Sequence, residues 1–107
     1  MAKTATQLKA PGQLANVAAT VFTTPTGLTI IRYIHVINQT ASSVSFTMSL
    51  GADSATTRIF DAYPISAFTT LDFFTYHVVA SGVTVQAFAS SASALNLTVD
   101  GDVITLG

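Results

Sequence analysis

The 107-residue sequence contains no cysteine, no tryptophan and no glutamate, and these absences exclude several kinds of chemistry. Without cysteine the chain has no disulfide framework, no zinc–thiolate site and no thiol nucleophile. It also lacks an apolar run of the roughly 20 residues that a membrane-spanning helix needs. The first twenty residues lack the apolar segment of a secretory signal. We therefore predict no membrane span and no secretory leader.

Charge is equally scarce. Charged residues make up 8% of the chain, whereas a typical soluble domain has about 25%. The four basic residues are scattered and the net charge is −1, so we predict no nucleic-acid partner, because such a partner requires a basic patch. Hydration of the surface must come largely from 17 Thr and 10 Ser. Near-zero net charge favours association, and we expect a homo-oligomer, a trimer being our first choice.

The residues that could carry catalysis form no known arrangement. His35 and His77 are the two histidines, and neither a G-x-S-x-G elbow nor a glycine-rich phosphate loop accompanies them. The spacing of the histidines does not support a metal site. Asp100-Gly101-Asp102 lacks the six or so oxygen ligands of a calcium site and favours a turn or bulge. We predict no enzyme activity, no metal and no cofactor.

Alternating apolar and polar residues predict β-strands through most of the chain. In "SVSFTMSL" the apolar residues Val44, Phe46, Met48 and Leu50 share one face, and Ser and Thr occupy the other. Glycine, proline and serine clusters such as "TPTG" separate the strands. Strands are expected over 16–23, 28–38, 43–50, 56–63, 69–76, 83–90, 94–99 and 103–106, the last two joined by a hairpin turn or, as we favour, forming one long strand with a bulge.

The spacing of the expected strands predicts an all-β fold. Strand starts recur roughly every 10–15 residues, which is typical of an antiparallel two-sheet sandwich. We expect a jelly-roll-like sandwich of seven to eight strands over residues 16–107. Residues 1–15 alternate weakly and contain Pro11-Gly12. They predict an extended N-terminal arm that packs on a neighbouring subunit through Leu8 and Leu14, or else a frayed tail.

Two predicted strands are apolar on both faces. In residues 28–38 the even positions include Ile30 and Ile34, while the odd positions include Ile31 and Tyr33; residues 71–79 behave in the same way. A strand of a two-sheet sandwich needs one hydrated face, so the second face should be covered by another chain. Arg32 should find a carboxylate partner, with Asp61 or Asp72 as candidates. The predicted interface residues are Leu8, Leu14, Ile31, Tyr33, His35, Phe74 and Tyr76.

Three stretches resemble small β-sandwich virion structural proteins of tailed bacteriophages. They are "TIIRYIHVIN" (29–38), "FTMSLGADSA" (46–55) and "SGVTVQAFASSASALNLTVDGDVI" (81–104), and the resemblance covers about residues 13–106. It implies a non-enzymatic structural protein of the virion, present in several copies and in contact with other virion proteins. A minor tail protein is the first expectation, and a capsid decoration protein is the alternative. The resemblance implies no catalytic residues.

Two further readings stay open. A carbohydrate- or receptor-binding module would need an exposed aromatic platform, and Tyr63 in "AYPI" is the one tyrosine expected near a loop. A monomeric domain of unknown role is the other alternative. It would sediment as a single 11.1 kDa species without association.

Overall fold

The computed structural model describes residues 2–105, and within that range the chain forms eight strands and no helix. The strands are longest in the first, third, sixth and eighth positions. Their bounds are β1 (Ala2–Gln13), β2 (Ala19–Thr23), β3 (Leu28–Asn38), β4 (Val44–Leu50), β5 (Arg58–Ile65), β6 (Thr70–Val79), β7 (Thr84–Ala89) and β8 (Leu95–Thr105).

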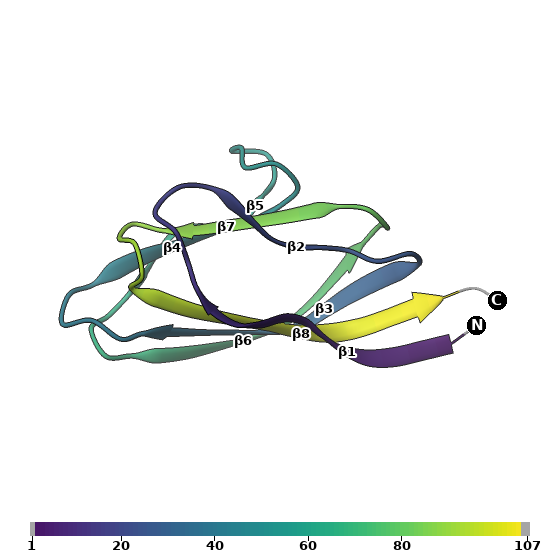
Figure 1. Cartoon of the computed structure of the whole chain (residues 1–107), viewed down its shortest axis with the longest axis horizontal. Coiled ribbons are helices and arrows are strands. Elements are labelled where there is room, and N and C mark those ends of the chain that lie inside the picture. The colour runs from purple at the N-terminus through teal and green to yellow at the C-terminus, as the bar shows by residue number, and fades with distance from the viewer. Residues whose placement is uncertain (1, 106–107) are drawn as a thin grey trace.

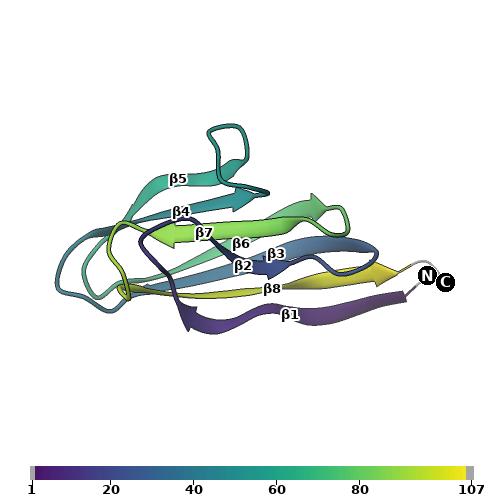
Figure 2. The same ribbon diagram turned by 45° about the horizontal axis from the view of Figure 1, so that its top comes forward.

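The strands form two antiparallel sheets of four. The first sheet has the order β1-β8-β3-β6 and the second has the order β2-β7-β4-β5. Figure 1 shows the two sheets as stacked layers, and Figure 2 shows the loop between β4 and β5 rising away from them. β4 pairs with β5, β3 with β6, β2 with β7 and β1 with β8. This nested pairing is the jelly-roll arrangement, so the predicted all-β sandwich is confirmed.

The N-terminal segment is extended, as expected, but it pairs with its own chain. β1 runs antiparallel to β8, from Ala2 opposite Thr105 to Gln13 opposite Asn96. Leu14 is 3% exposed and lies in the chain's own core, and Leu8 packs against that core. The division into an arm over 1–15 and a domain over 16–107 is therefore corrected to one sandwich that includes β1. A strand at the edge of a sheet needs no strict alternation, which explains the weak pattern of this segment.

A row of bulges crosses the first sheet beside Asp100-Gly101. β8 itself continues without interruption, as the bulge interpretation predicted, but the extra residues lie in its neighbours. Between Gln7 and Lys9 in β1 and between Ile31 and Tyr33 in β3, the pairing with β8 shifts by one residue. Since one residue reverses the face on which all later side chains point, the odd and even positions of β3 exchange roles at Arg32.

The core lies between the sheets and is closed at one end by a buried amide. Phe46 and Met48 from β4 meet Ile31, Ile34 and residues of β7 and β8 there. Asn38, at the end of β3, is fully buried, and its Nδ2 donates to the carbonyl oxygens of Ser42 (2.8 Å), Ile65 (3.0 Å) and Ser66 (3.2 Å). Its Oδ1 accepts from the amide of Thr40. Asn38 therefore connects the first sheet to the end of β5 in the second.

Candidate interaction surface

The outer face of β6 carries a stripe of exposed apolar side chains. Phe74 is 83% exposed, Tyr76 is 67% exposed and Val78 is 56% exposed. Leu71, Phe73 and Val79 point the other way and pack in or against the core. The two apolar faces predicted for this strand are thus both present, one inside the sandwich and one uncovered in the single chain. We call Phe74, Tyr76 and Val78 the β6 stripe.

Residues of β3 support the β6 stripe from beside it. The Tyr33 ring stacks on Phe74 with 5.1 Å between ring centroids, and the Arg32 guanidinium lies 5.7 Å from the centroid of Tyr76. Because of the bulge, Arg32, Tyr33 and His35 are all oriented away from the core. Strict alternation over residues 28–38 predicts opposite faces for Arg32 and His35, and this prediction is wrong.

Arg32 has a carboxylate partner, but it is neither of the predicted ones. Its Nη1 lies 3.1 Å from Asp102 Oδ2, and Lys3 approaches the same oxygen at 3.6 Å. Asp102 is on β8, the strand on the opposite side of β3 from β6. Asp61 instead pairs with Arg58, and Asp72 binds Tyr33 and His35. Register decides the partner here, because β8 places Asp102 opposite Ile30, two residues from Arg32.

Tyr33, His35 and Asp72 form a hydrogen-bonded group at the edge of the β6 stripe. The Tyr33 hydroxyl donates to Asp72 Oδ1 at 2.6 Å, and His35 Nδ1 lies 2.5 Å from the same oxygen. The hydrogen bond from Tyr33, and then that with His35, lowers the pKa of the Asp72 carboxyl. The same bond raises the pKa of the Tyr33 hydroxyl, because the hydroxyl loses its hydrogen bond to Asp72 when it ionises. The group fixes the Tyr33 ring beneath Phe74.

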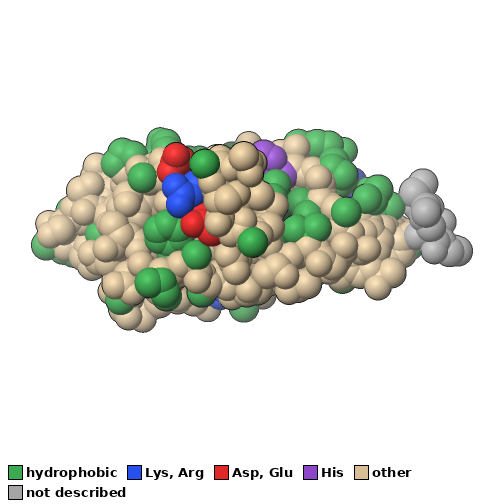
Figure 3. Space-filling view, turned by 90° about the horizontal axis from the view of Figure 1, so that it is seen from above, with side chains coloured by type: hydrophobic (Ala, Val, Ile, Leu, Met, Phe, Trp, Pro, Cys, Tyr) green, Lys and Arg blue, Asp and Glu red, His purple; other side chains and the backbone are tan. Residues whose placement is uncertain are grey.

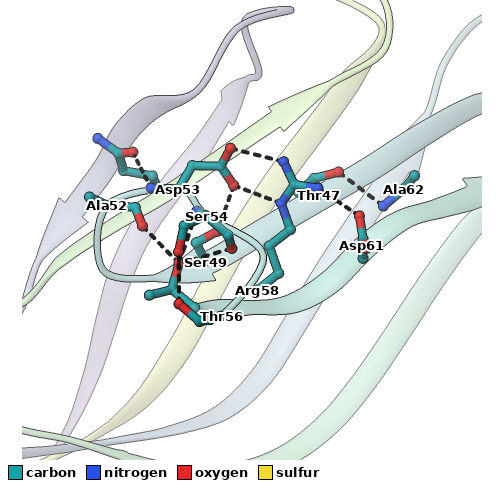
Figure 4. Close-up of polar contacts among 11 residues, drawn as sticks. Thr47, Ser49, Ala52, Asp53, Ser54, Thr56, Arg58, Asp61 and Ala62 are labelled. Carbon is teal, nitrogen blue, oxygen red and sulfur yellow. Dashed lines mark hydrogen bonds and ion pairs between the residues drawn. The ribbon is translucent and has the colours of Figure 1, made fainter.

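A second polar cluster lies in the loop between β4 and β5 (Figure 4). Arg58 donates from Nε and Nη2 to the two oxygens of Asp53, at 2.9 and 3.0 Å, and from Nη1 to Asp61 at 2.8 Å. Hydrogen bonds from Arg58 and then Ser49 lower the pKa of Asp53, and the two carboxylates raise the pKa of Arg58. Figure 3 shows a blue group between red ones on a face that is otherwise mostly tan and green.

This cluster ties the loop down over the second sheet. Gln86 Oε1 accepts from the amide of Asp53 at 2.9 Å, and Ser49 donates to Asp53 at 2.8 Å. Ser49, which the alternation places on the outer face of β4, is therefore buried beneath the loop. Thr47 on the same face is also buried, and its Oγ1 accepts from the amide of Ala62 in β5. These hydrogen bonds join the loop to β4 and β7, so we assign the cluster a structural role.

Tyr63, the candidate for sugar binding, lies in β5 and not in a loop. It is 42% exposed, and its ring packs edge-on against Phe60 and Phe73 at 6.2 and 5.5 Å. Its aromatic face is thus partly used within the molecule, and it offers less free ring surface than Phe74 or Tyr76.

The seven predicted interface residues divide into three groups. Ile31 and Leu14 are buried in the chain's own core, which removes them from the accessible surface. Leu8, Tyr33 and His35 are half-buried, and Phe74 and Tyr76 are exposed. Val78 belongs with the last two and was missed, although its even parity with Phe74 and Tyr76 could have identified it.

No cavity of ligand size is found in the part of the chain from 2 to 105. Within that same range no three His, Cys, Asp or Glu side chains come together as metal ligands would. A helix able to cross a membrane is likewise missing from the described residues. Comparison with protein-family models, with curated protein sequences and with solved structures gives no match.

Proposed function

We propose that this chain is a non-enzymatic structural subunit of a phage virion and that it attaches to other virion proteins through the β6 stripe. The observation that carries the proposal is the exposure of Phe74, Tyr76 and Val78 side by side on one face. The jelly-roll order supports it, since this arrangement recurs in viral capsid domains, although lectins and cupins share it. The resemblance of three stretches to phage virion proteins points in the same direction.

The physical argument for contact is the cost of leaving this face in water. A Phe or Tyr side chain buries about 150–250 Å² when fully covered, and apolar area contributes about 25 cal/mol per Å². Tyr33 and Arg32 hold the rings in place, so little side-chain freedom is lost on binding. Rigid aromatic anchors of this kind dominate the energy of protein interfaces.

The test is whether the chain is present in particles. Gradient-purified virions from the strain that encodes it should contain the chain by mass spectrometry, and labelled antibodies should place it on the tail by electron microscopy. Labelling spread over the head would favour the decoration-protein alternative. A particle fraction free of the chain, with all of it in the soluble lysate, would overturn the proposal.

Sugar binding is a second candidate, favoured by two exposed rings beside polar side chains. Phe74 and Tyr76 lie next to Asp72 and Arg32, which could bind sugar hydroxyls. A glycan array comparing Tyr76→Ala with Tyr63→Ala discriminates the sites. Signal lost in the first variant and kept in the second favours a platform on β6, and an array without signal for the unaltered chain excludes this candidate.

A further inference from the structure

Four strands lie at sheet edges, and three of them carry two or more features that hinder pairing with another chain. Edge strands are commonly protected by lysine, proline, bulges or short length. β1 has Lys3, Lys9, Pro11 and two register shifts. β2 is five residues long and contains a register shift. β5 contains Pro64 and a bulge at Ala62, whose φ is 50°.

β6 is the exception among these four described edges. It is ten residues long and contains no proline, lysine or arginine. Its one carboxylate, Asp72, is already bound to Tyr33 and His35. Its single protective feature is one register shift, where Thr75 and Tyr76 lie opposite Arg32. There Thr75 Oγ1 donates to the Ile31 carbonyl at 2.8 Å. The least protected edge and the β6 stripe belong to the same strand.

The geometry points to a second copy of this chain as the occupant: two β6 strands pair antiparallel, edge to edge, about a two-fold axis. The two four-stranded sheets then form one continuous eight-stranded sheet, with the order β1-β8-β3-β6 followed by its reverse. The inference rests on the proposed assembly role and names the partner. In a two-fold contact both subunits use the same patch. The free main-chain groups of one β6 can therefore hydrogen-bond to those of the other β6.

The β6 stripe fixes the position of the axis. Phe74, Tyr76 and Val78 are centred on Tyr76, so an axis there places Tyr76 opposite Tyr76 of the partner subunit. Phe74 then faces Val78 of the partner subunit on the outer face of the sheet, and Thr75 faces His77 of the partner subunit on the inner face. Directly opposed side chains in an antiparallel pair are about 4.5–5.5 Å apart at Cβ, within contact distance for such residues.

Charge agrees with this pairing, and the buried area limits its strength. Eight residues separate Asp72 from Asp72 of the partner subunit along the paired strands, or roughly 26 Å at about 3.3 Å per residue, so the two carboxylates do not repel. A net charge of −1 per chain adds little further repulsion. Each of the four aromatic side chains would bury about 150–250 Å² if it were fully covered, and side-by-side contact across the paired edges covers only part of that. The buried area therefore falls below the 1,200–2,000 Å² typical of a stable interface. We therefore expect a reversible dimer.

The first measurement is sedimentation of the full chain from roughly micromolar to millimolar concentration. The expected result is a monomer–dimer equilibrium between 11.1 kDa and twice that mass. A trimer, or a monomer at every concentration, would overturn the inference.

A charge exchange at the axis tests the register. Tyr76→Lys and Tyr76→Glu each place like charges opposite one another, and each should weaken dimerisation by about tenfold or more. An equimolar mixture should dimerise more tightly than either variant alone, because lysine then faces glutamate. Val17→Lys, at an exposed apolar position in the loop before β2, should leave the dimer unchanged. A mixture no tighter than its components would refute an axis at Tyr76.

Hydrogen exchange separates edge pairing from stacking of the two outer faces. On dimerisation, amides of β6 should exchange more slowly, whereas amides of β1, β2 and β5 should not change. A dimer without added protection in β6 would overturn the edge pairing. A chain that fails to pair through β6, or that stays monomeric, can still be present in purified virions. The proposed function is therefore tested separately from the dimer.

Discussion

At the scale of single residues, Gly101 shows how closely the first sheet is built around its bulges. A Cβ at this position would collide with the carbonyl oxygen of Ile30, which the bulge in β3 brings over β8. The obstacle is backbone and cannot swing aside as a flexible side chain could. Gly101 is thus required by the close approach of two strands.

Gly101→Ala should lower the free energy of unfolding by about 1–3 kcal/mol, the usual cost of forcing extra volume into a packed site. Urea denaturation measures it. Gly12→Ala is the matched control, because the atom nearest to its added Cβ is the mobile end of Lys9, and it should change stability by less than about 0.5 kcal/mol. Equal stability of the two variants would show that β3 and β8 separate easily.

Asn38→Ala should also destabilise the sandwich, by about 1–3 kcal/mol, since it leaves carbonyl oxygens of β5 and its following turn without a donor. Asn96→Ala removes an exposed bond to Gln39 and should have little effect. Thermal unfolding of both variants checks the comparison. A loss no greater than that of the control would contradict the assigned role of Asn38 in joining the sheets.

The Tyr33–Asp72 bond predicts a pH dependence at both extremes. The pKa of Asp72 is lowered from 3.8 in the folded chain, so its stabilising contribution is complete above that value and is lost as pH falls through the lower folded pKa. The pKa of Tyr33 is raised from 10.0, so its contribution is complete below that value and is lost as pH rises through the higher folded pKa. Tyr33→Phe removes the contribution of the hydroxyl to both effects, while the hydrogen bond between His35 and Asp72 remains. The unfolding free energy of this variant should therefore approach that of the unaltered chain as pH falls through the lowered pKa of Asp72 and as pH rises through the raised pKa of Tyr33.

The same experiment contains its own reference. Asp53 has a lowered pKa as well, through Arg58, and its acid-induced loss of stability should persist in Tyr33→Phe. A constant difference between the two proteins across the whole pH range would mean that the hydroxyl contributes by packing alone.

At the scale of elements, β3 and β6 respond differently to charge. Phe74→Asp alters a side chain that is 83% exposed, so the fold should lose less than about 0.5 kcal/mol while self-association is weakened. Tyr33→Asp places a second carboxylate beside Asp72 under the Phe74 ring, so it should lower both stability and association. Denaturation and sedimentation of each variant separate these effects. Unfolding by Phe74→Asp alone would place that ring in the core.

The elements also show where sequence reasoning ends. The position of β6 and its two apolar faces follow from alternation, and Phe74 and Tyr76 were identified in this way. Which side chains of β3 point to the core could not be predicted. The shift at Arg32 depends on the register with β8, and no feature of the local sequence indicates it. The burial of Thr47 and Ser49 could not be predicted for a similar reason, since nothing in β4 reveals that the bulge of β5 meets Thr47 and that the next loop meets Ser49.

At the scale of the whole molecule, the predicted class and strand count agree with the structure, but the first strand was misjudged. Seven of the eight strands are predicted from their own apolar residues, whereas β1 is recognised only through its partner β8, more than eighty residues away. Long-range pairing of this kind is set by the complete set of strands. No single segment contains enough information to predict it.

The nested pairing gives the strands an order in time. β4 and β5 are neighbours along the chain and can meet early, while each outer pair must enclose all the pairs within it. During synthesis β1 leaves the ribosome before the other strands, and it can pair only after β8 has been made. β1 therefore stays unpaired for longer than the other strands. It also carries Lys3, Lys9 and Pro11, residues that discourage premature association with other nascent chains.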